Sequence, residues 1–182
     1  MARIAVMGSG TGSNFEALYE EFGEEIVLVI SDQSEAGILA KARRFGIDTV
    51  IEESGPDLSA RILGHLEAID LVCLAGFMRI VKEPLLSAFP RRMLNIHPSL
   101  LPHYPGKEAW EQAIADGATI SGCTVHFVDA GIDTGEILLQ EEVPVLPDDS
   151  PSTLHARIQA AEHRVYPKAV NLCLREMGVG DE

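Results

Sequence analysis

The chain alternates short apolar segments with segments of helical pattern. Strands that are apolar at every position are buried on both faces, as in parallel sheets. We expect strands at 3–7, 25–31, 48–51, 70–75 and 93–96, of which 70–75 shows this pattern most clearly, with helices at 14–22, 36–45, 58–68 and 107–116. This order predicts a three-layer α/β architecture with a mostly parallel sheet.

The C-terminal third follows another pattern. Two longer segments, 120–128 and 136–145, are joined by a turn at 129–135, so we expect an antiparallel strand pair. A long helix is expected over 151–177, with an interruption near Pro167. Because no linker or internal repeat is apparent, we expect residues 1–182 to form a single domain.

Composition excludes several classes of partner. The formal net charge is −14, and a surface of this sign repels nucleic acid and anionic lipid. The densest basic run, 41–44, is expected to be a solvated helix face. No apolar stretch approaches the roughly 20 residues of a membrane span, and no signal peptide is apparent. The three widely spaced cysteines favour reduced, buried thiols and a cytoplasmic location.

A glycine-rich loop, Gly8-Ser9-Gly10-Thr11-Gly12-Ser13-Asn14, follows the first expected strand and opens a helix. Glycines allow close backbone approach, and unpaired N–H groups at a helix start attract anions, which favours a phosphate. A dinucleotide fingerprint is the alternative, because Asp32 ends the second strand. The glycine spacing argues against it, and a plain tight turn is the third possibility.

A second segment, Ala75-Gly76-Phe77-Met78-Arg79-Ile80, follows the fourth strand. It is either a strand end with a bulky turn or an apolar slot whose backbone could pair with a flat heterocycle. Local pattern leaves both readings open.

The candidate catalytic residues are Asn95, His97 and Asp133. An amide, an imidazole and a carboxylate can stabilise an oxyanion and move protons, as acyl transfer requires. None is a covalent nucleophile, so direct transfer between two bound substrates is indicated. The rival reading is a structural histidine and a locally bonded turn aspartate.

The surroundings of His97 favour catalysis. Three prolines within the next eight residues stiffen the loop and would hold Asn95 and His97 toward one place. Of the other histidines, we expect His103 to be exposed and His126 to be satisfied within the sheet. No pair of histidines has a convincing metal spacing, so no metal is expected.

These motifs together resemble the glycinamide ribonucleotide formyltransferases, folate-dependent enzymes of purine synthesis within the wider formyltransferase superfamily. The resemblance rests on Gly10–Asn14, Leu74–Ile80, Asn95–Pro102, Thr124–Val128 and Gly131–Gly135, and continues to the 159–167 stretch. It implies a Rossmann-like formyltransferase fold and transfer of the formyl group of 10-formyltetrahydrofolate, a co-substrate, to the amine of glycinamide ribonucleotide. Residues 1–95 would form the phosphate side and 96–182 the catalytic and folate side.

The resemblance also implies roles for individual residues. The ribonucleotide would contact Gly12, Ser13, Asn14, Gln159 and Glu162, and the folate would contact Met78, Arg79, Ile80, Val81, Val128 and Asp129. Asn95 and His97 would stabilise the oxyanion, while Asp133 would hold the imidazolium and help to move the amine proton. The Leu101–Pro102 bond would be cis. Relatives place an arginine near the folate's glutamate tail, for which Arg61 is the nearest candidate.

Two alternatives remain at the level of sequence. The first is a formyltetrahydrofolate hydrolase or a formyltransferase for another amine, and the second is a non-enzymatic nucleotide-binding module. The expected partners are small-molecule substrates, with the chain as a monomer or a homodimer.

Overall fold

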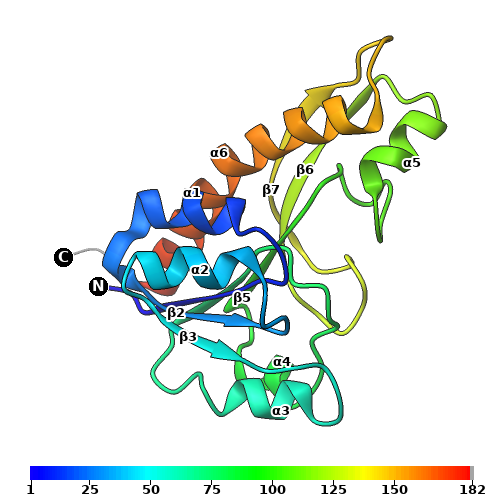
Figure 1. Ribbon diagram of the computed structural model, residues 1–182. Helices are drawn as coiled ribbons and strands as arrows, with labels where there is room; N and C mark the ends of the chain where they lie inside the picture. The colour runs from blue at the N-terminus through cyan, green and yellow to red at the C-terminus, as the bar shows by residue number, and fades with distance from the viewer. Residues whose placement is uncertain (181–182) are drawn as a thin grey trace.

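The computed structural model describes residues 1–180, which build a seven-stranded sheet in the order β3-β2-β1-β4-β5-β6-β7 (Figure 1). The strands are β1 Ile4–Met7, β2 Ile26–Ser31, β3 Asp48–Ile51, β4 Leu71–Leu74, β5 Met93–His97, β6 Ile120–Phe127 and β7 Ile137–Pro144. The helices are α1 Ser13–Phe22, α2 Gly37–Arg44, α3 Leu58–Leu63, α4 Leu85–Ala88, α5 Ala109–Ala115 and α6 Pro151–Met177, with a 3-10 turn at Gly23–Glu25.

Helices cover both faces of the sheet. Figure 1 shows α1, α2 and α6 on one side and α3 and α4 on the other. Side chains of β1 pack on both faces of the sheet. Ile4 and Val6 belong to the core against α1, α2 and α6, whereas Ala5 and Met7 belong to the core against α3 and α4. The predicted three-layer α/β fold with strands buried on both faces is therefore confirmed.

The sheet changes direction at β5. Strands β1 to β5 run parallel, while β5 pairs with β6, and β6 with β7, in antiparallel fashion. The predicted antiparallel pair is confirmed. The β5–β6 register sets Asn95 opposite His126 and His97 opposite Thr124. Residues from distant parts of the chain thus meet where β5 ends.

The helices differ from the expectations in two places. The short helix α4 between β4 and β5 was not predicted, because four residues carry too little pattern to be recognised. α6 runs without interruption through Pro167. Buried side chains on both sides of the proline, including Tyr166 and Val170, anchor this helix in the core, and this packing outweighs the lost backbone hydrogen bond.

Close packing of β6 against β7 leads to a stability prediction at Gly122. A Cβ at this position would lie 2.1 Å from the carbonyl oxygen of Glu141 and 2.7 Å from Cδ2 of Leu100. Because backbone must shift to admit it, we expect Gly122→Ala to lower the free energy of unfolding by about 2–3 kcal/mol. Urea denaturation measures this. Gly10→Ala is the control, since nothing lies within 4 Å of a Cβ there; equal losses would contradict the prediction.

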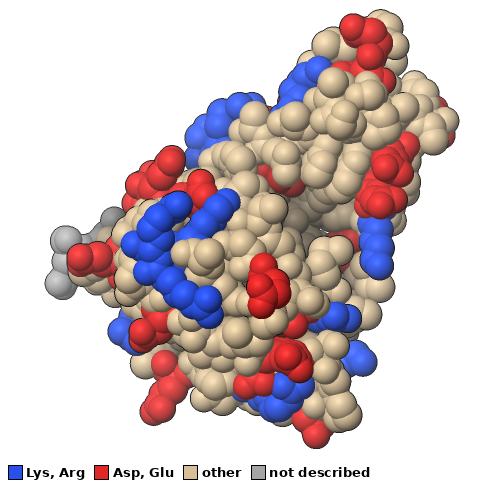
Figure 2. Space-filling model, in the orientation of Figure 1, with Lys and Arg blue, Asp and Glu red and all other residues tan. Residues whose placement is uncertain are grey.

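Basic side chains gather over α2 in Figure 2. They are Lys41, Arg43 and Arg44 in the last turn of that helix. The Nζ atom of Lys41 lies 2.6 Å from Oε1 of Glu16, and both arginines are exposed. The densest basic run is therefore a solvated helix face, as predicted. Within residues 1–180, no helix combines the length and the apolar character that crossing a membrane requires.

Candidate active site

The three predicted catalytic side chains meet at the C-terminal end of β5. Nδ1 of His97 lies 3.4 Å from Oδ2 of Asp133. Nδ2 of Asn95 lies 3.2 Å from Nε2 of His126, and that nitrogen lies 3.9 Å from Oδ1 of Asp133. The structure thus joins an amide, two imidazoles and a carboxylate in one cluster, drawn from β5, β6 and the turn after β6.

The His97 ring is buried and held from one side. Its Nε2 donates a hydrogen bond of 2.9 Å to the carbonyl oxygen of Tyr104. The Nδ1 contact with Asp133 is longer than a charge-assisted hydrogen bond of about 2.7–2.9 Å. Nδ1 is therefore the nitrogen that can be shared with an incoming oxyanion.

Hydrogen bonds from β6 and β7 brace the proline-rich loop, residues 98–106. Oγ1 of Thr124 donates to the carbonyl oxygen of Ser99 over 2.7 Å and accepts from the backbone N of Leu101 over 3.1 Å. Nε2 of Gln140 donates to the carbonyl oxygen of Leu101 over 2.9 Å. The Leu101–Pro102 peptide bond is cis, as the resemblance implied. His97 thus stands at the start of a loop fixed by side chains from two other strands.

Asp133 takes an unusual backbone conformation. Its φ is 55°, in the left-handed region, which aspartate and asparagine tolerate better than most residues. Its Oδ2 accepts a 2.8 Å hydrogen bond from the backbone N of Gly106. The carboxylate therefore ties the end of the proline-rich loop to the turn after β6 while it faces His97.

His126 is the member of the cluster that sequence analysis missed. It is satisfied within the sheet, as expected, because Nδ1 donates over 2.9 Å to the carbonyl oxygen of Phe127 and Nε2 faces Asn95 of β5, but its membership of the cluster was not predicted. Burial, the largest effect, lowers the pKa of His126, so its neutral form leaves Nε2 free to accept from Asn95. The β5–β6 register was the signal that could have identified it.

The glycine-rich loop lies between β1 and α1. Gly12 caps α1 with a φ of 82°, and a Cβ there would lie 2.9 Å from Ile38, so only glycine fits. The backbone N of Ile38 donates to the carbonyl oxygen of Gly10 over 3.0 Å. This geometry presents the N–H groups at the start of α1, with Ser13 in the first position, to an anion.

Asn14 and Glu162 bring α1 and α6 together on this side. Nδ2 of Asn14 lies 3.2 Å from Oε2 of Glu162. Oδ1 of Asn14 is buried and finds no hydrogen-bond partner among residues 1–180. Gln159, half-buried, stands one turn before Glu162 on α6. A polar ligand in contact with Asn14 would satisfy this oxygen.

The charge state of Glu162 leads to a pH prediction. Burial raises the pKa of Glu162 from 4.5 to about 7, and the hydrogen bond from Asn14 offsets this only in part. The folded state therefore binds more protons than the unfolded chain between these values, so this carboxyl's contribution to stability is lost as pH rises from about 4.5 through about 7. We expect Glu162→Gln to remove that loss.

Urea denaturation at about pH 5 and about pH 8 measures the effect. The exposed Glu142→Gln is the control and should keep the wild-type dependence on pH. An identical dependence in Glu162→Gln and wild type would contradict the assignment.

The predicted folate residues lie on two segments. Met78 and Ile80 are exposed, whereas Val81 is buried in the core beside α3 and α4, against which Val128 also packs. A folate contact at Val81 would therefore involve its backbone rather than its side chain. Oδ1 of Asp129 accepts from the backbone N of Gly131 over 2.9 Å and from Oγ1 of Thr134 over 2.7 Å, which shapes the turn.

Two charged residues have partners that sequence analysis did not foresee. Nε of Arg79 donates to Oδ2 of Asp32 over 2.7 Å, so Asp32 is not free to hold a ribose as the dinucleotide alternative requires. Arg61 pairs with Glu52 and also donates to the carbonyl oxygens of Glu53 and Pro56. Because these contacts occupy its guanidinium, Arg61 is no longer a candidate for binding the folate tail.

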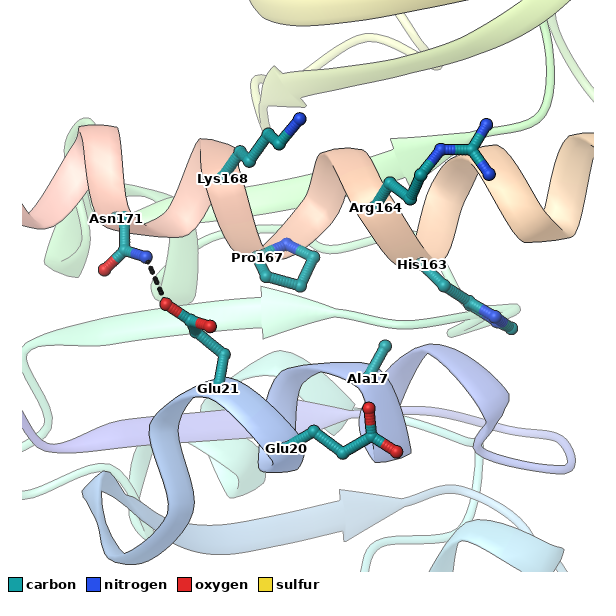
Figure 3. Close-up of a pocket in the computed structure, with 8 residues that line it drawn as sticks. All are labelled: Ala17, Glu20, Glu21, His163, Arg164, Pro167, Lys168 and Asn171. Atoms are coloured by element: carbon teal, nitrogen blue, oxygen red, sulfur yellow. Dashed lines mark hydrogen bonds between the residues drawn. The ribbon is translucent and has the colours of Figure 1, made fainter.

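A hollow of about 410 Å³ lies elsewhere, between α1 and α6 (Figure 3). It is lined by Ala17, Glu20, Glu21, His163, Arg164, Pro167, Lys168 and Asn171. Nδ2 of Asn171 donates to Oε1 of Glu21 over 2.8 Å across one end. None of the predicted site residues lines this hollow. Among residues 1–180, no cluster of three His, Cys, Asp or Glu side chains is arranged to hold a metal ion.

The chain is similar to known proteins over most of its length. The sequence pattern of the formyl transferase family matches residues 2–170. The glycinamide ribonucleotide transformylase 1 of Symbiobacterium toebii is similar with a TM-score of 0.90 and 47% identity, over 93% of this chain and 86% of that one. The phosphoribosylglycinamide formyltransferase of Streptococcus pneumoniae has a TM-score of 0.90 and 43% identity, over 94% and 98%.

A longer relative is the human trifunctional purine biosynthetic protein adenosine-3, which is 45% identical over 94% of this chain and 18% of its own length. The chain thus spans about a fifth of the length of such curated relatives. From the match across residues 2–170 and these similarities, the chain belongs to the formyl transferase family.

Proposed function

We propose that this protein transfers the formyl group of 10-formyltetrahydrofolate to the amine of glycinamide ribonucleotide in purine biosynthesis. The observation that carries the proposal is the cluster of Asn95, His97 and Asp133, whose His97 Nδ1 and Asp133 Oδ2 lie 3.4 Å apart. The structures named above as similar over most of both chains carry this activity in their names and support the choice of substrates.

The proposed reaction passes through a tetrahedral intermediate. The glycinamide amine attacks the formyl carbon, forming a C–N bond while the formyl oxygen gains negative charge. The amide N–H of Asn95 and Nδ1–H of His97 stabilise this oxyanion. Asp133 stabilises the imidazolium and assists proton loss from the amine. When the bond to N10 of the folate breaks, N10 takes up a proton, leaving formylglycinamide ribonucleotide and tetrahydrofolate.

His126 orients the amide in this scheme. Its Nε2 accepts from Nδ2 of Asn95 over 3.2 Å, so one amide N–H is occupied and the side chain is fixed. The other N–H of the same nitrogen is the donor that we assign to the oxyanion. A preorganised donor of this kind spares the reorganisation that water would require.

The substrates would bind on either side of this cluster. The ribonucleotide phosphate would lie on Gly12, Ser13 and Asn14 at the start of α1, with Gln159 and Glu162 as further contacts of the ribonucleotide. The folate would use Met78, Arg79, Ile80, Val81, Val128 and Asp129. We infer that residues 1–182 form a single domain. The proposed folate residues come from both its N-terminal part, 1–95, and its C-terminal part, 96–182, so both parts contribute to the active site.

The decisive experiment is a transfer assay with both substrates. Formylated ribonucleotide should appear in equal amount to the tetrahydrofolate formed. Release of formate and tetrahydrofolate without formylated ribonucleotide would favour the hydrolase, and formylation of other amines at a comparable kcat/KM would favour a different acceptor.

We also infer a cytoplasmic location and a monomeric or homodimeric state. The cysteines Cys73, Cys123 and Cys173 are free and buried, and burial raises the pKa of each thiol. Such unreactive thiols suit a reducing compartment. Sedimentation equilibrium of the full chain would decide between the two states.

A further inference from the structure

The loop assigned to the ribonucleotide phosphate touches the segment assigned to the folate. The contact is made by Ser9. Its backbone N donates to the carbonyl oxygen of Gly76 over 3.0 Å. Its Oγ accepts from the backbone N of Met78 over 2.9 Å. Two hydrogen bonds therefore fasten the glycine-rich loop to the loop after β4.

Asp32, directly after β2, accepts hydrogen bonds from both segments. Its Oδ1 accepts from Oγ of Ser9 over 2.5 Å, and its Oδ2 accepts from Nε of Arg79 over 2.7 Å. The Asp32 side chain is 1% exposed and that of Arg79 is 40% exposed. The arginine is thus oriented by a buried carboxylate while its outer end faces solvent.

Because Asp32 is charged, separating either segment from it costs free energy. Burial alone raises the pKa of Asp32, but hydrogen bonds from Ser9, Arg79 and Gln33 outweigh it, so the net shift of the pKa is downward. A buried carboxylate that loses a partner is strongly destabilised. Movement of either segment away from Asp32 would remove such a partner. The positions of the two segments are therefore linked.

We propose that Ser9 and Asp32 couple ribonucleotide binding to folate binding, so that each substrate tightens the binding of the other. This inference rests on the proposed function. A ligand that orders the glycine-rich loop fixes the position of Ser9. Because Ser9 contacts Met78 directly and Arg79 through Asp32, the position of the folate segment is fixed as well. Ser9 and Asp32 are positioning residues, since neither needs to touch the reacting atoms.

The chain offers a matched control. Asp149 and Arg157 form a similar pair, with side chains 3% and 31% exposed and Oδ2 of Asp149 lying 2.8 Å from Nη1 of Arg157. This pair joins the start of α6 to the segment before it and contains no proposed substrate contact. Asp149→Asn thus tests the loss of a buried ion pair by itself.

Calorimetric titration measures the coupling directly. The affinity for glycinamide ribonucleotide is determined alone and with saturating tetrahydrofolate, which lacks the formyl group and cannot react. In wild type we expect tetrahydrofolate to tighten ribonucleotide binding at least about 5-fold, and by linkage the reverse effect must be equal. Ser9→Ala and Asp32→Asn should reduce this factor to below about 2-fold, whereas Asp149→Asn should keep it.

Several results would overturn the inference. They are a wild-type factor near unity, full coupling in Ser9→Ala, or equal loss of coupling in Asp149→Asn. If Asp32→Asn fails to fold, Ser9→Ala decides, because it removes one hydroxyl. Failure of wild type to transfer the formyl group would refute the proposed function and this inference with it. Normal transfer with coupling independent of Ser9 would refute this inference alone.

Discussion

Replacing His97 with alanine is expected to lower kcat for formyl transfer more than about 10²-fold, with ribonucleotide affinity unchanged. The imidazole is buried, and Nδ1 is the nitrogen that can reach the oxyanion, because Nε2 is bonded to Tyr104. Loss of one preorganised donor costs about 3–4 kcal/mol of transition-state stabilisation. The proposed phosphate contacts lie at the start of α1, so the binding of the ribonucleotide should not depend on this ring.

Steady-state kinetics with both substrates, together with calorimetry for the ribonucleotide, separate these effects. His103→Ala is the matched control, because His103 is an exposed histidine of the same proline-rich loop and should retain wild-type kcat. Near-normal turnover in His97→Ala would remove His97 from the mechanism. A parallel fall in ribonucleotide affinity would instead point to a collapsed loop.

Replacing Asp133 with asparagine is expected to reduce kcat more than about 10²-fold as well. The substitution separates charge from shape. Asparagine tolerates the left-handed conformation at φ 55° and can still accept the hydrogen bond from the backbone N of Gly106. It removes the negative charge beside Nδ1 of His97. The imidazolium and the departing amine proton therefore lose their stabilising partner while the turn persists.

The exposed Asp148→Asn makes the same change in net charge away from the site and should keep wild-type kcat. We expect ribonucleotide affinity and the denaturation midpoint of Asp133→Asn to remain close to wild type. Turnover within about 3-fold of wild type would show that the carboxylate charge plays no part in the chemistry.

Most of the fold could be predicted because its signals are local. A strand such as β1 or β4 is apolar at every position, and this alone indicates burial on both faces. The glycine-rich loop could likewise be placed at the start of α1, since glycine spacing after a strand is visible in seven consecutive residues. The short α4 was not predictable because four residues carry too little pattern, and the uninterrupted path of α6 through Pro167 was not predictable because packing against distant side chains decides it.

The candidate site divides in the same way. Asn95, His97 and Asp133 are recognisable by residue type and by their loops, and the structure brings them together. His126 is satisfied within the sheet as expected, but its contact with Asn95 was not predicted, because that contact depends on which residue of β5 lies opposite it. Arg61 was considered for the folate tail, yet a nearby carboxylate and two carbonyl oxygens occupy it.

The order of the buried strands, the glycine-rich loop and the residue types of the candidate site can thus be recognised in short stretches of the chain. Their physical basis is the apolar surface and backbone freedom of neighbouring residues, which need no distant partner. The pairing of Asp32 with Ser9 and Arg79, and of His126 with Asn95, arose only when strands far apart in the chain packed side by side. Hydrogen bonds and buried charges depend on positions within about 3 Å, and only the assembled sheet sets those positions.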